Sequence, residues 1–362
     1  MNLLSFYVNE NFYTISPYLT AKVILMAMLI AGVWSEIDQI IKNGKYVRQT
    51  SVHNGEISDH IIKAISEHPG RFHLIASWSC PWSHRAMLIR QLKGLENYIP
   101  LHMTGGKRVE GYPANFGKSW SVPGTDINIV HLHQLYTLND RSHTGRPTVP
   151  VLWDSQEQKI VSNESSKIMR AFNSVKTANS SSVSQADFTL VPEALVDEID
   201  SINDRIYKKL SNGVYRARFA QSQSAHQIAV TQVFDMLDEL EEHLATNRYL
   251  MGASITEADW RLFPTLLRFD IDYFIHSRCS RHRLVDYRNL WAYARDLYAW
   301  DGVTQTINME AIHLSNYSGE DIVAEMPSND WAEPHDRGRL GARNVTLYSG
   351  KTVSIDTDNS TI

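Results

Sequence analysis

The feature that most constrains the fold is a cysteine between a buried strand and a helix. Residues 71–78 form an apolar run that is typical of a buried strand. Cys80 and Pro81 follow, and proline is well suited to the first turn of a helix. Residues 82–95 then carry apolar side chains at helical spacing. This order predicts an α/β domain in which Cys80 lies directly at a helix N-terminus.

A cysteine in this position has a physical route to reactivity. It faces unpaired backbone N–H groups and the positive end of the helix dipole, and both favour a thiolate over a thiol. His84 and Arg85 follow within the first turn and are expected to add positive charge. The alternative is a buried structural thiol, but the strand–Cys-Pro–helix setting favours a functional one. Cys80 is therefore the predicted nucleophile.

The cysteine count limits the chemistry. Ser83 stands where a dithiol enzyme carries its resolving cysteine, so a mixed disulfide on Cys80 needs an external thiol to resolve it. The chain has only two cysteines, and Cys279 lies in the helical part, where we expect a structural role. Two cysteines exclude a disulfide-rich scaffold and disfavour a cysteine-based metal site. We therefore expect no metal.

Composition and charge exclude other classes. The chain of 362 residues is 43% hydrophobic with a formal net charge of −5, which is typical of a globular protein and not of a nucleic-acid binder. The apolar run at residues 23–34 is shorter than the ~20 residues that a transmembrane helix needs. We expect neither a membrane span nor a secretory signal, and interpret residues 1–27 as an N-terminal extension or the result of a mis-set start, with the compact protein beginning near Met28.

Polar segments divide the rest of the chain. Residues 104–147 are rich in Gly, Asn and Pro and are expected to be one long loop. Two short strands (148–154, interrupted by Pro150, and 159–161) and a helix at 164–172 follow, and then a Ser-rich linker at 173–185. The predicted units are an extension at 1–27, an α/β domain at 28–175, an all-helical domain at 186–338 and a disordered polar tail at 339–362.

Two α/β motifs and one helical motif carry a resemblance to a known family. They are Cys80-Pro81-Trp82-Ser83-His84-Arg85, the run 149–154 followed by Ser162-Asn163-Glu164-Ser165-Ser166, and the run 256–266 with Arg268-Phe269-Asp270. From about Met28 to Arg337 the chain resembles the glutathionyl-hydroquinone reductases, the xi class of glutathione transferases. The resemblance implies a thioredoxin-like glutathione-binding domain, an all-α transferase C-terminal domain, a homodimer and a cytoplasmic location.

The resemblance also implies a reaction with glutathione as co-substrate. Cys80 would attack the thioether sulfur of a glutathionyl-hydroquinone, release the hydroquinone and hold glutathione as a mixed disulfide, which a second glutathione resolves. A cis Val149-Pro150 bond is implied as well. The implied glutathione-binding residues are Trp120, Arg146, Val149, Glu164 and Ser165, and the implied hydroquinone-binding residues are Tyr215, Tyr273 and Tyr317. The sequence departs from the family pattern at Ser79, at Ser83 and before Trp120, where Lys118-Ser119 replaces the usual glycine context.

Three other functions use a related fold. An omega-like transferase with dehydroascorbate reductase or deglutathionylating activity would use the same Cys80 chemistry on another leaving group. A conjugating transferase would need Ser or Tyr where Cys80 stands, because a cysteine traps glutathione as a disulfide. A non-catalytic interaction module would have no reason to keep Cys80 at a helix start.

Overall fold

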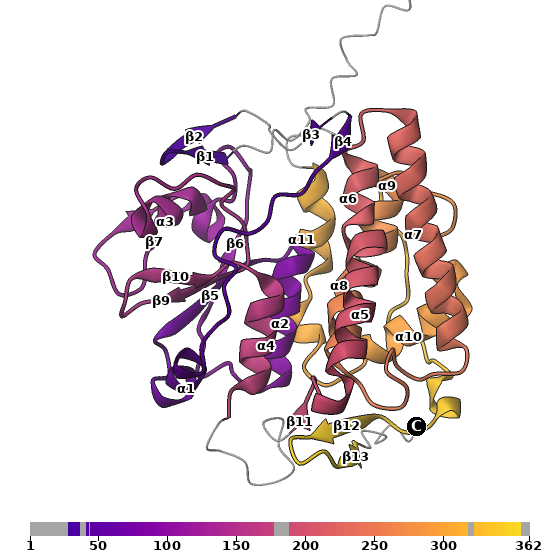
Figure 1. Cartoon of the computed structure of the whole chain (residues 1–362). Coiled ribbons are helices and arrows are strands. Elements are labelled where there is room, and N and C mark those ends of the chain that lie inside the picture. Colours follow the sequence, from indigo (N-terminus) through magenta and orange to yellow (C-terminus); the bar gives the residue numbers. More distant parts are fainter. Residues whose placement is uncertain (1–27, 37–40, 43, 177–187, 318–321, 356–362) are drawn as a thin grey trace, which may run out of the picture.

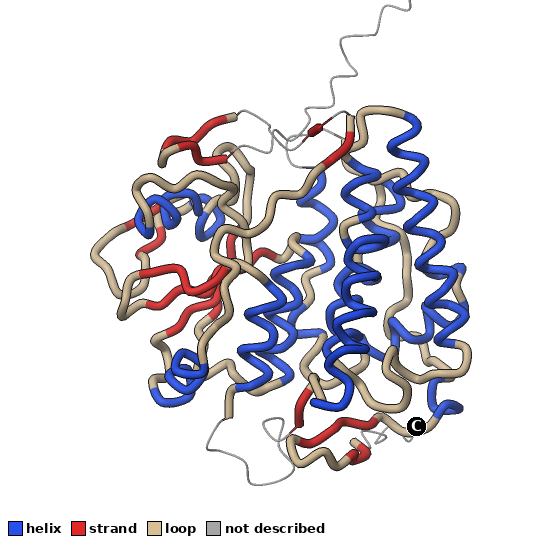
Figure 2. Tube along the Cα trace, viewed as in Figure 1, coloured by secondary structure: helices blue, strands red, loops and turns tan. Residues whose placement is uncertain are grey.

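The computed structural model describes residues 28–36, 41–42, 44–176, 188–317 and 322–355. The predicted extension at 1–27 and most of the predicted linker lie outside these residues. Figure 1 shows strands and helices of the first half beside a group of helices formed by the second half. Figure 2 shows the same division, with most strands gathered on one side. The sequence-based assignment of an α/β part followed by a helical part is confirmed.

The α/β half is built on a four-stranded sheet with the order β10-β9-β5-β6. Its strands are β5 (Phe72–Ser77), β6 (Leu101–Thr104), β9 (Val151–Asp154) and β10 (Lys159–Ser162). β5 is parallel to β6 and antiparallel to β9, and β9 is antiparallel to β10. β5 is central because its run of apolar residues can be buried on both faces.

Side chains alternate across this sheet, as the two-residue period of a strand requires. Phe72 and Leu74 of β5 belong to a core shared with α2 (Pro81–Leu92) and α4 (Ser165–Ser174). Ile75 points to the opposite face, into a core that includes α3 (Leu132–Asn139). The α/β half thus has helices on both faces of its sheet.

The remaining elements of the α/β half are short. They are α1 (Asp59–Glu67), the hairpin β1 (Met28–Ile30) and β2 (Val33–Ser35), the hairpin β3 (Ile41–Lys42) and β4 (Lys45–Tyr46), and the pair β7 (Trp120–Ser121) and β8 (Asn128–Ile129). The expectation that 104–147 is a single loop is wrong, because it contains α3, β7 and β8. Apolar side chains at Leu132, Leu135 and Tyr136 bury one face of α3, and His131 and Gln134 cap its start.

The central helix of the helical half is α8 (Glu257–Leu267), in which ten of the eleven residues are buried. Its other helices are α5 (Val196–Ile206), α6 (Gly213–Arg218), α7 (Gln223–Leu244), α9 (Phe274–His276), α10 (Arg288–Tyr298) and α11 (Met309–Leu314). Thr256 and Asp259 form the predicted capping box at the start of α8. A π-helical segment, Phe269–Tyr273, follows α8, and such segments are frequent at functional sites.

The predicted disordered tail is wrong for residues 339–355. β11 (Phe188–Thr189) pairs with β12 (Asn344–Leu347), which pairs with β13 (Thr352–Ser354). Arg339 and Arg343 of this segment donate to the Asn289 side chain at 3.2 Å and to the Asp296 carboxylate at 2.9 Å, both in α10. The polar side chains that suggested disorder therefore supply hydrogen bonds to the helical half. Just before this segment, Arg337 is fully buried and donates to three backbone carbonyls at and after the end of α7. No helix among the described residues is long and apolar enough to cross a membrane.

Candidate active site

Cys80 lies where the sequence predicts it, at the N-cap of α2, and only 6% of its surface is exposed. The backbone N–H of Ser83 donates to its sulfur at 3.5 Å. The thiol in turn reaches the carbonyl oxygen of Val149, also at 3.5 Å. Free N–H groups at a helix start stabilise negative charge. The Cys80 sulfur therefore lies between the N-terminus of α2 and the backbone carbonyl of Val149.

The predicted cis bond between Val149 and Pro150 is confirmed. The adjacent Thr148 is fixed by Tyr136 of α3, whose hydroxyl donates to the Thr148 carbonyl at 2.7 Å and accepts from its N–H at 3.2 Å. The Asn163 amide donates to the Tyr136 hydroxyl at 3.0 Å. This network places the Val149 backbone beside Cys80.

Glu164 and Ser165 begin α4, as expected. Glu164 is the N-cap, and its carboxylate accepts from the backbone N–H of Ser166 at 3.3 Å and from its hydroxyl at 3.1 Å. The Ser51 hydroxyl donates to the other carboxylate oxygen at 3.0 Å. The Glu164 carboxylate can bind an ammonium group, and the free backbone N–H groups at the start of α4 can bind a carboxylate group.

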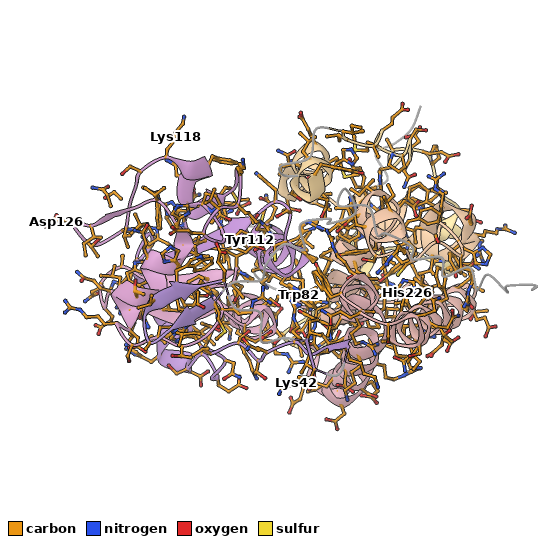
Figure 3. The ribbon with its side chains drawn as sticks, turned by 90° about the horizontal axis from the view of Figure 1, so that it is seen from above. Lys42, Trp82, Tyr112, Lys118, Asp126 and His226 are labelled. Carbon is orange, nitrogen blue, oxygen red and sulfur yellow. The ribbon has the colours of Figure 1, made fainter. Side chains whose placement is uncertain are left out.

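Arg146 and Trp120, the two residues expected to contribute from the long loop, lie in different surroundings. Burial raises the pKa of Tyr112, which lies near Cys80, and Arg146 is close enough to Tyr112 for its positive charge to oppose that rise. Trp120 lies in β7 with its ring 5.1 Å from that of His102, and among the described residues no hydrogen bond or ring contact joins it to Cys80. In Figure 3, Lys118, two residues before Trp120, lies at the outer edge, whereas Trp82 and Tyr112 lie between the two halves.

The helical half brings the three tyrosines together, although they are far apart in the sequence. The rings of Tyr215 and Tyr273 meet edge to face at 5.9 Å. Tyr317 is linked to them through His276, one turn after Tyr273, at a ring distance of 4.8 Å. Burial, with Cys80 and Asp272 nearby, raises the pKa of Tyr215.

Tyr273 has an unusual environment. Burial, with Tyr215 and Asp272 nearby, raises the pKa of Tyr273 well above its ordinary value, so its hydroxyl stays protonated. That hydroxyl is buried and has no hydrogen-bond partner of good geometry among the described residues. A buried hydroxyl without a partner is costly, and a bound oxygen atom would satisfy it.

The expectation that His84 adds positive charge at Cys80 is wrong. Burial and the nearby Arg268 lower the pKa of His84 well below its ordinary value, so the ring is neutral at neutral pH. Its Nε2 lies 2.9 Å from the Thr306 hydroxyl. Arg85 also contacts the helical half, because its Nε donates to the Arg261 carbonyl at 2.9 Å. The spacing within α2 is correct, but both side chains point into the helical half.

Arg268 provides the charge that His84 lacks. It lies at the C-terminal end of α8, is 1% exposed, and donates from Nη2 to the Trp78 carbonyl at 2.7 Å and from Nε to the Ser79 carbonyl at 3.3 Å. Nη1 also lies 3.1 Å from His84 Nδ1. An arginine remains protonated at neutral pH even when buried. A cation from the helical half therefore holds the backbone that leads into Cys80.

Sequence reasoning gave no role to three residues near Cys80: Arg48, Tyr112 and Arg268. Arg268 stands in one of the motifs that carry the resemblance, which is the signal that could have identified it. Arg48 and Tyr112 lie in segments without clear periodicity, and only the fold brings them to the site.

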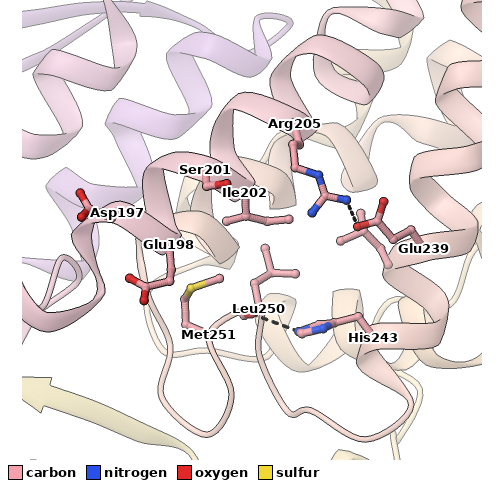
Figure 4. Close-up of a pocket in the computed structure, with 10 residues that line it drawn as sticks. Asp197, Glu198, Ser201, Ile202, Arg205, Glu239, His243, Leu250 and Met251 are labelled. Atoms are coloured by element: carbon pink, nitrogen blue, oxygen red, sulfur yellow. Dashed lines mark hydrogen bonds and ion pairs between the residues drawn. The ribbon is translucent and has the colours of Figure 1, made fainter.

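A surface cavity of about 470 Å³ lies elsewhere, between α5, α7 and the turn at Leu250 and Met251 (Figure 4). Its rim carries an Arg205–Glu239 ion pair, and no residue that lines it belongs to the site around Cys80. Among the described residues, no three His, Cys, Asp or Glu side chains are grouped to hold a metal ion.

Comparison with known proteins agrees with this geometry. Residues 79–175 match the model of the glutathione S-transferase N-terminal domain, and residues 214–296 match that of the C-terminal domain. The chain is 40% identical to the glutathionyl-hydroquinone reductase PcpF of Sphingobium chlorophenolicum, covering 82% of this chain and 93% of that protein. It is 37% identical to the glutathionyl-hydroquinone reductase YqjG of Escherichia coli K-12, covering 86% and 98%.

Solved structures give the same result. The xi-class transferase of Natrialba magadii superposes with a TM-score of 0.73 at 35% identity, covering 87% of this chain and 98% of that one. The glutathione-bound structure of Escherichia coli YqjG superposes with a TM-score of 0.71 at 36% identity, covering 86% and 98%. The chain belongs to the glutathionyl-hydroquinone reductases, the xi class of the glutathione S-transferases.

Proposed function

We propose that this enzyme reduces glutathionyl-hydroquinones to hydroquinones with glutathione as the reductant. The observation that carries the proposal is the position of Cys80, at a helix N-terminus, with the Val149 backbone on one side and Tyr215 close enough to interact electrostatically. The names of the relatives PcpF and YqjG support the same reaction.

The proposed reaction has two steps, which need only the Cys80 thiolate, the substrate and a second glutathione. The Cys80 thiolate attacks the thioether sulfur of the substrate, a new S–S bond forms, and the sulfur–carbon bond to the ring breaks. The ring carbon that bears sulfur takes up the proton of a ring hydroxyl, so the electron pair of the broken bond passes through the ring to that oxygen, and protonation of the oxygen yields the hydroquinone. A second glutathione thiolate then attacks the mixed disulfide, releases glutathione disulfide and restores the Cys80 thiolate.

Glutathione would lie along the α/β half. Its peptide would pair with the Val149 backbone, and its γ-glutamyl end would meet Glu164 and Ser165 at the start of α4. Arg146 and Trp120 are assigned to glutathione by the family resemblance. Arg146 is near Tyr112 and Trp120 is on β7, so we expect a larger effect from replacing Arg146 than from replacing Trp120.

The hydroquinone ring would occupy the space at the tyrosines. The protonated Tyr273 hydroxyl can donate to a ring oxygen, and Tyr215 packs against it. Tyr317 would close the far side through its contact with His276. Hydroxyl donors stabilise charge that develops on the ring oxygens as the sulfur–carbon bond breaks.

Turnover of a glutathionyl-hydroquinone with glutathione tests the proposal, with hydroquinone and glutathione disulfide as the measured products. Cys80→Ser should abolish the reaction, whereas the matched control Cys279→Ser should keep it. The Cys279 side chain is fully buried in the helical half, and burial raises its pKa to about 12. Full turnover by Cys80→Ser would end the proposal.

An omega-like activity on mixed disulfides or dehydroascorbate uses the same cysteine, and omega-like transferases are among the relatives, for example in Schizosaccharomyces pombe at 38% identity over 66% of this chain. The two activities differ in whether they need the tyrosines. Assaying the three substrates side by side ranks them by kcat/KM. A higher value for dehydroascorbate than for the aromatic thioether would favour the omega-like function.

The resemblance also implies a homodimer in the cytoplasm that uses glutathione and no metal. Sedimentation of the purified protein and fractionation of the source cells test the first two expectations. Unchanged turnover after dialysis against a chelator tests the third.

A further inference from the structure

An N-terminal strap, residues 44–53, crosses from the helical half to the α/β half beside the site. At one end the Gly44 carbonyl accepts from the Gln221 N–H at 3.0 Å, and the Tyr46 ring packs on Phe219 at 5.2 Å. At the other end His53 and Asn163 share hydrogen bonds in both directions, at 3.0 and 3.1 Å. In Figure 1 this indigo segment runs from β4, beside α6, toward the sheet.

The strap brings Arg48 to the middle of the site. Its guanidinium lies 4.8 Å from the centre of the Trp82 ring and 5.3 Å from that of Tyr215. Trp82 is two residues after Cys80, and Tyr215 is one of the tyrosines expected to bind the hydroquinone. A guanidinium between two aromatic faces is held firmly, because each ring attracts the cation.

The charge of Arg48 lacks an acidic partner. Among the described residues no carboxylate forms an ion pair with it, and its one hydrogen bond is to the Tyr46 hydroxyl at 3.3 Å. Burial opposes the charge, but Tyr46, Tyr215, Tyr207 and Cys80 together raise the pKa of Arg48. A half-buried cation surrounded by phenols and a thiol needs an anion from outside the protein.

We propose that Arg48 binds an ionised ring oxygen of the aromatic substrate, so that the enzyme prefers glutathione thioethers of phenols that are deprotonated at its working pH. Such phenols carry electron-withdrawing ring substituents. The proposal rests on the proposed function for the identity of the substrate, and adds the charge state that the site selects. Arg48 thereby acts as a specificity-determining residue that touches substrate.

Binding of 4-nitrophenol tests the charge preference without turnover, because its phenolate absorbs visible light. On wild-type protein the apparent pKa of the bound probe should fall by at least about one unit, a tenfold preference for the phenolate. Arg48→Met should abolish this shift, and Arg48→Lys should keep part of it. The control Arg205→Met removes an arginine from the distant cavity and should bind the probe like wild type.

Turnover provides the second measurement. Two glutathionyl-hydroquinones are compared, one with an ionised ring oxygen and one neutral at the assay pH. Arg48→Met should lose at least tenfold in kcat/KM on the ionised substrate and less than threefold on the neutral one. An equal loss on both, or no loss, overturns the proposal. A lower rate of Cys80 alkylation by iodoacetamide in Arg48→Met, together with an equal loss, would show that Arg48 acts on the thiolate instead.

The two proposals fail in different ways. If wild-type protein reduces glutathione mixed disulfides but neither aromatic thioether, the proposed function fails, while the 4-nitrophenol titration still decides whether Arg48 selects a phenolate. If both thioethers react and Arg48→Met treats them alike, only the role of Arg48 fails. Arg48→Lys, which keeps the charge and the long side chain, gives a folded comparison if Arg48→Met is unstable.

Discussion

Arg268→Met should destabilise the protein and slow the reaction of Cys80. The guanidinium makes four hydrogen bonds, to the carbonyls of Trp78, Ser79 and Pro264 and to His84, at 2.7, 3.3, 3.0 and 3.1 Å. Bonds to a charged group contribute roughly 1.5–3 kcal/mol each and are not additive. Burial of the charge, which lowers the pKa of Arg268, offsets part of that gain.

The net loss in the free energy of unfolding should be about 3–5 kcal/mol, because methionine leaves buried carbonyls without donors. Urea unfolding followed by tryptophan fluorescence measures this loss. The control Arg205→Met removes an exposed Arg205–Glu239 ion pair and should cost less than about 1 kcal/mol.

The rate of Cys80 alkylation at neutral pH gives the second measurement. It should fall in Arg268→Met under conditions where the variant is folded, because a nearby positive charge is lost, and it should be partly restored in Arg268→Lys. A free energy of unfolding within about 1 kcal/mol of the wild-type value, together with an unchanged alkylation rate, would refute the role given to Arg268.

Three further predictions follow from buried groups. Tyr273→Phe should lower kcat/KM on a glutathionyl-hydroquinone by roughly tenfold or more and leave the reduction of a non-aromatic mixed disulfide unchanged; equal loss on both would contradict a role at the ring. Burial and His102 lower the pKa of His73 to about 4, and His84 is also neutral in the folded state. An unfolded histidine takes up a proton near pH 6.5, so stability should fall as pH drops from about 6.5 toward 4, by up to ~1.4 kcal/mol per pH unit for each such residue; urea midpoints that stay constant over this range would contradict it. Arg337→Met should lower the free energy of unfolding by about 3 kcal/mol, measured by urea, because three carbonyls lose a buried donor; a midpoint equal to wild type would contradict this stabilising role of Arg337.

Local signals in the sequence are sufficient to predict the position of Cys80 between a strand and a helix. The apolar run before Cys80 and Pro81 after it determine strand and helix over a short range, and the structure has both. The capping residues at Glu164 gave the start of α4 in the same way. Such signals depend on neighbours along the chain, which is why they can be recognised in a single sequence.

Long-range packing could not be recognised in this way. The direction of His84 depends on α8, which lies more than 170 residues later in the sequence, so its neutral state required the fold. Arg48 reaches the site only because the strap is tied at both ends. The prediction of a disordered tail is wrong because a polar composition is typical both of disorder and of short hydrogen-bonded surface strands such as β12 and β13.

The pairing of β12 with β11 has a consequence for the order in which the protein can be assembled. β11 follows the linker, whereas β12 comes almost at the end of the chain, and the Tyr348 hydroxyl after it donates to the Asn173 carbonyl of α4. During synthesis the α/β half leaves the ribosome first. Its contact with the helical half can be completed only when Tyr348 emerges, so a nascent chain that stalls earlier would hold Cys80 in a protein that still lacks this strand pairing.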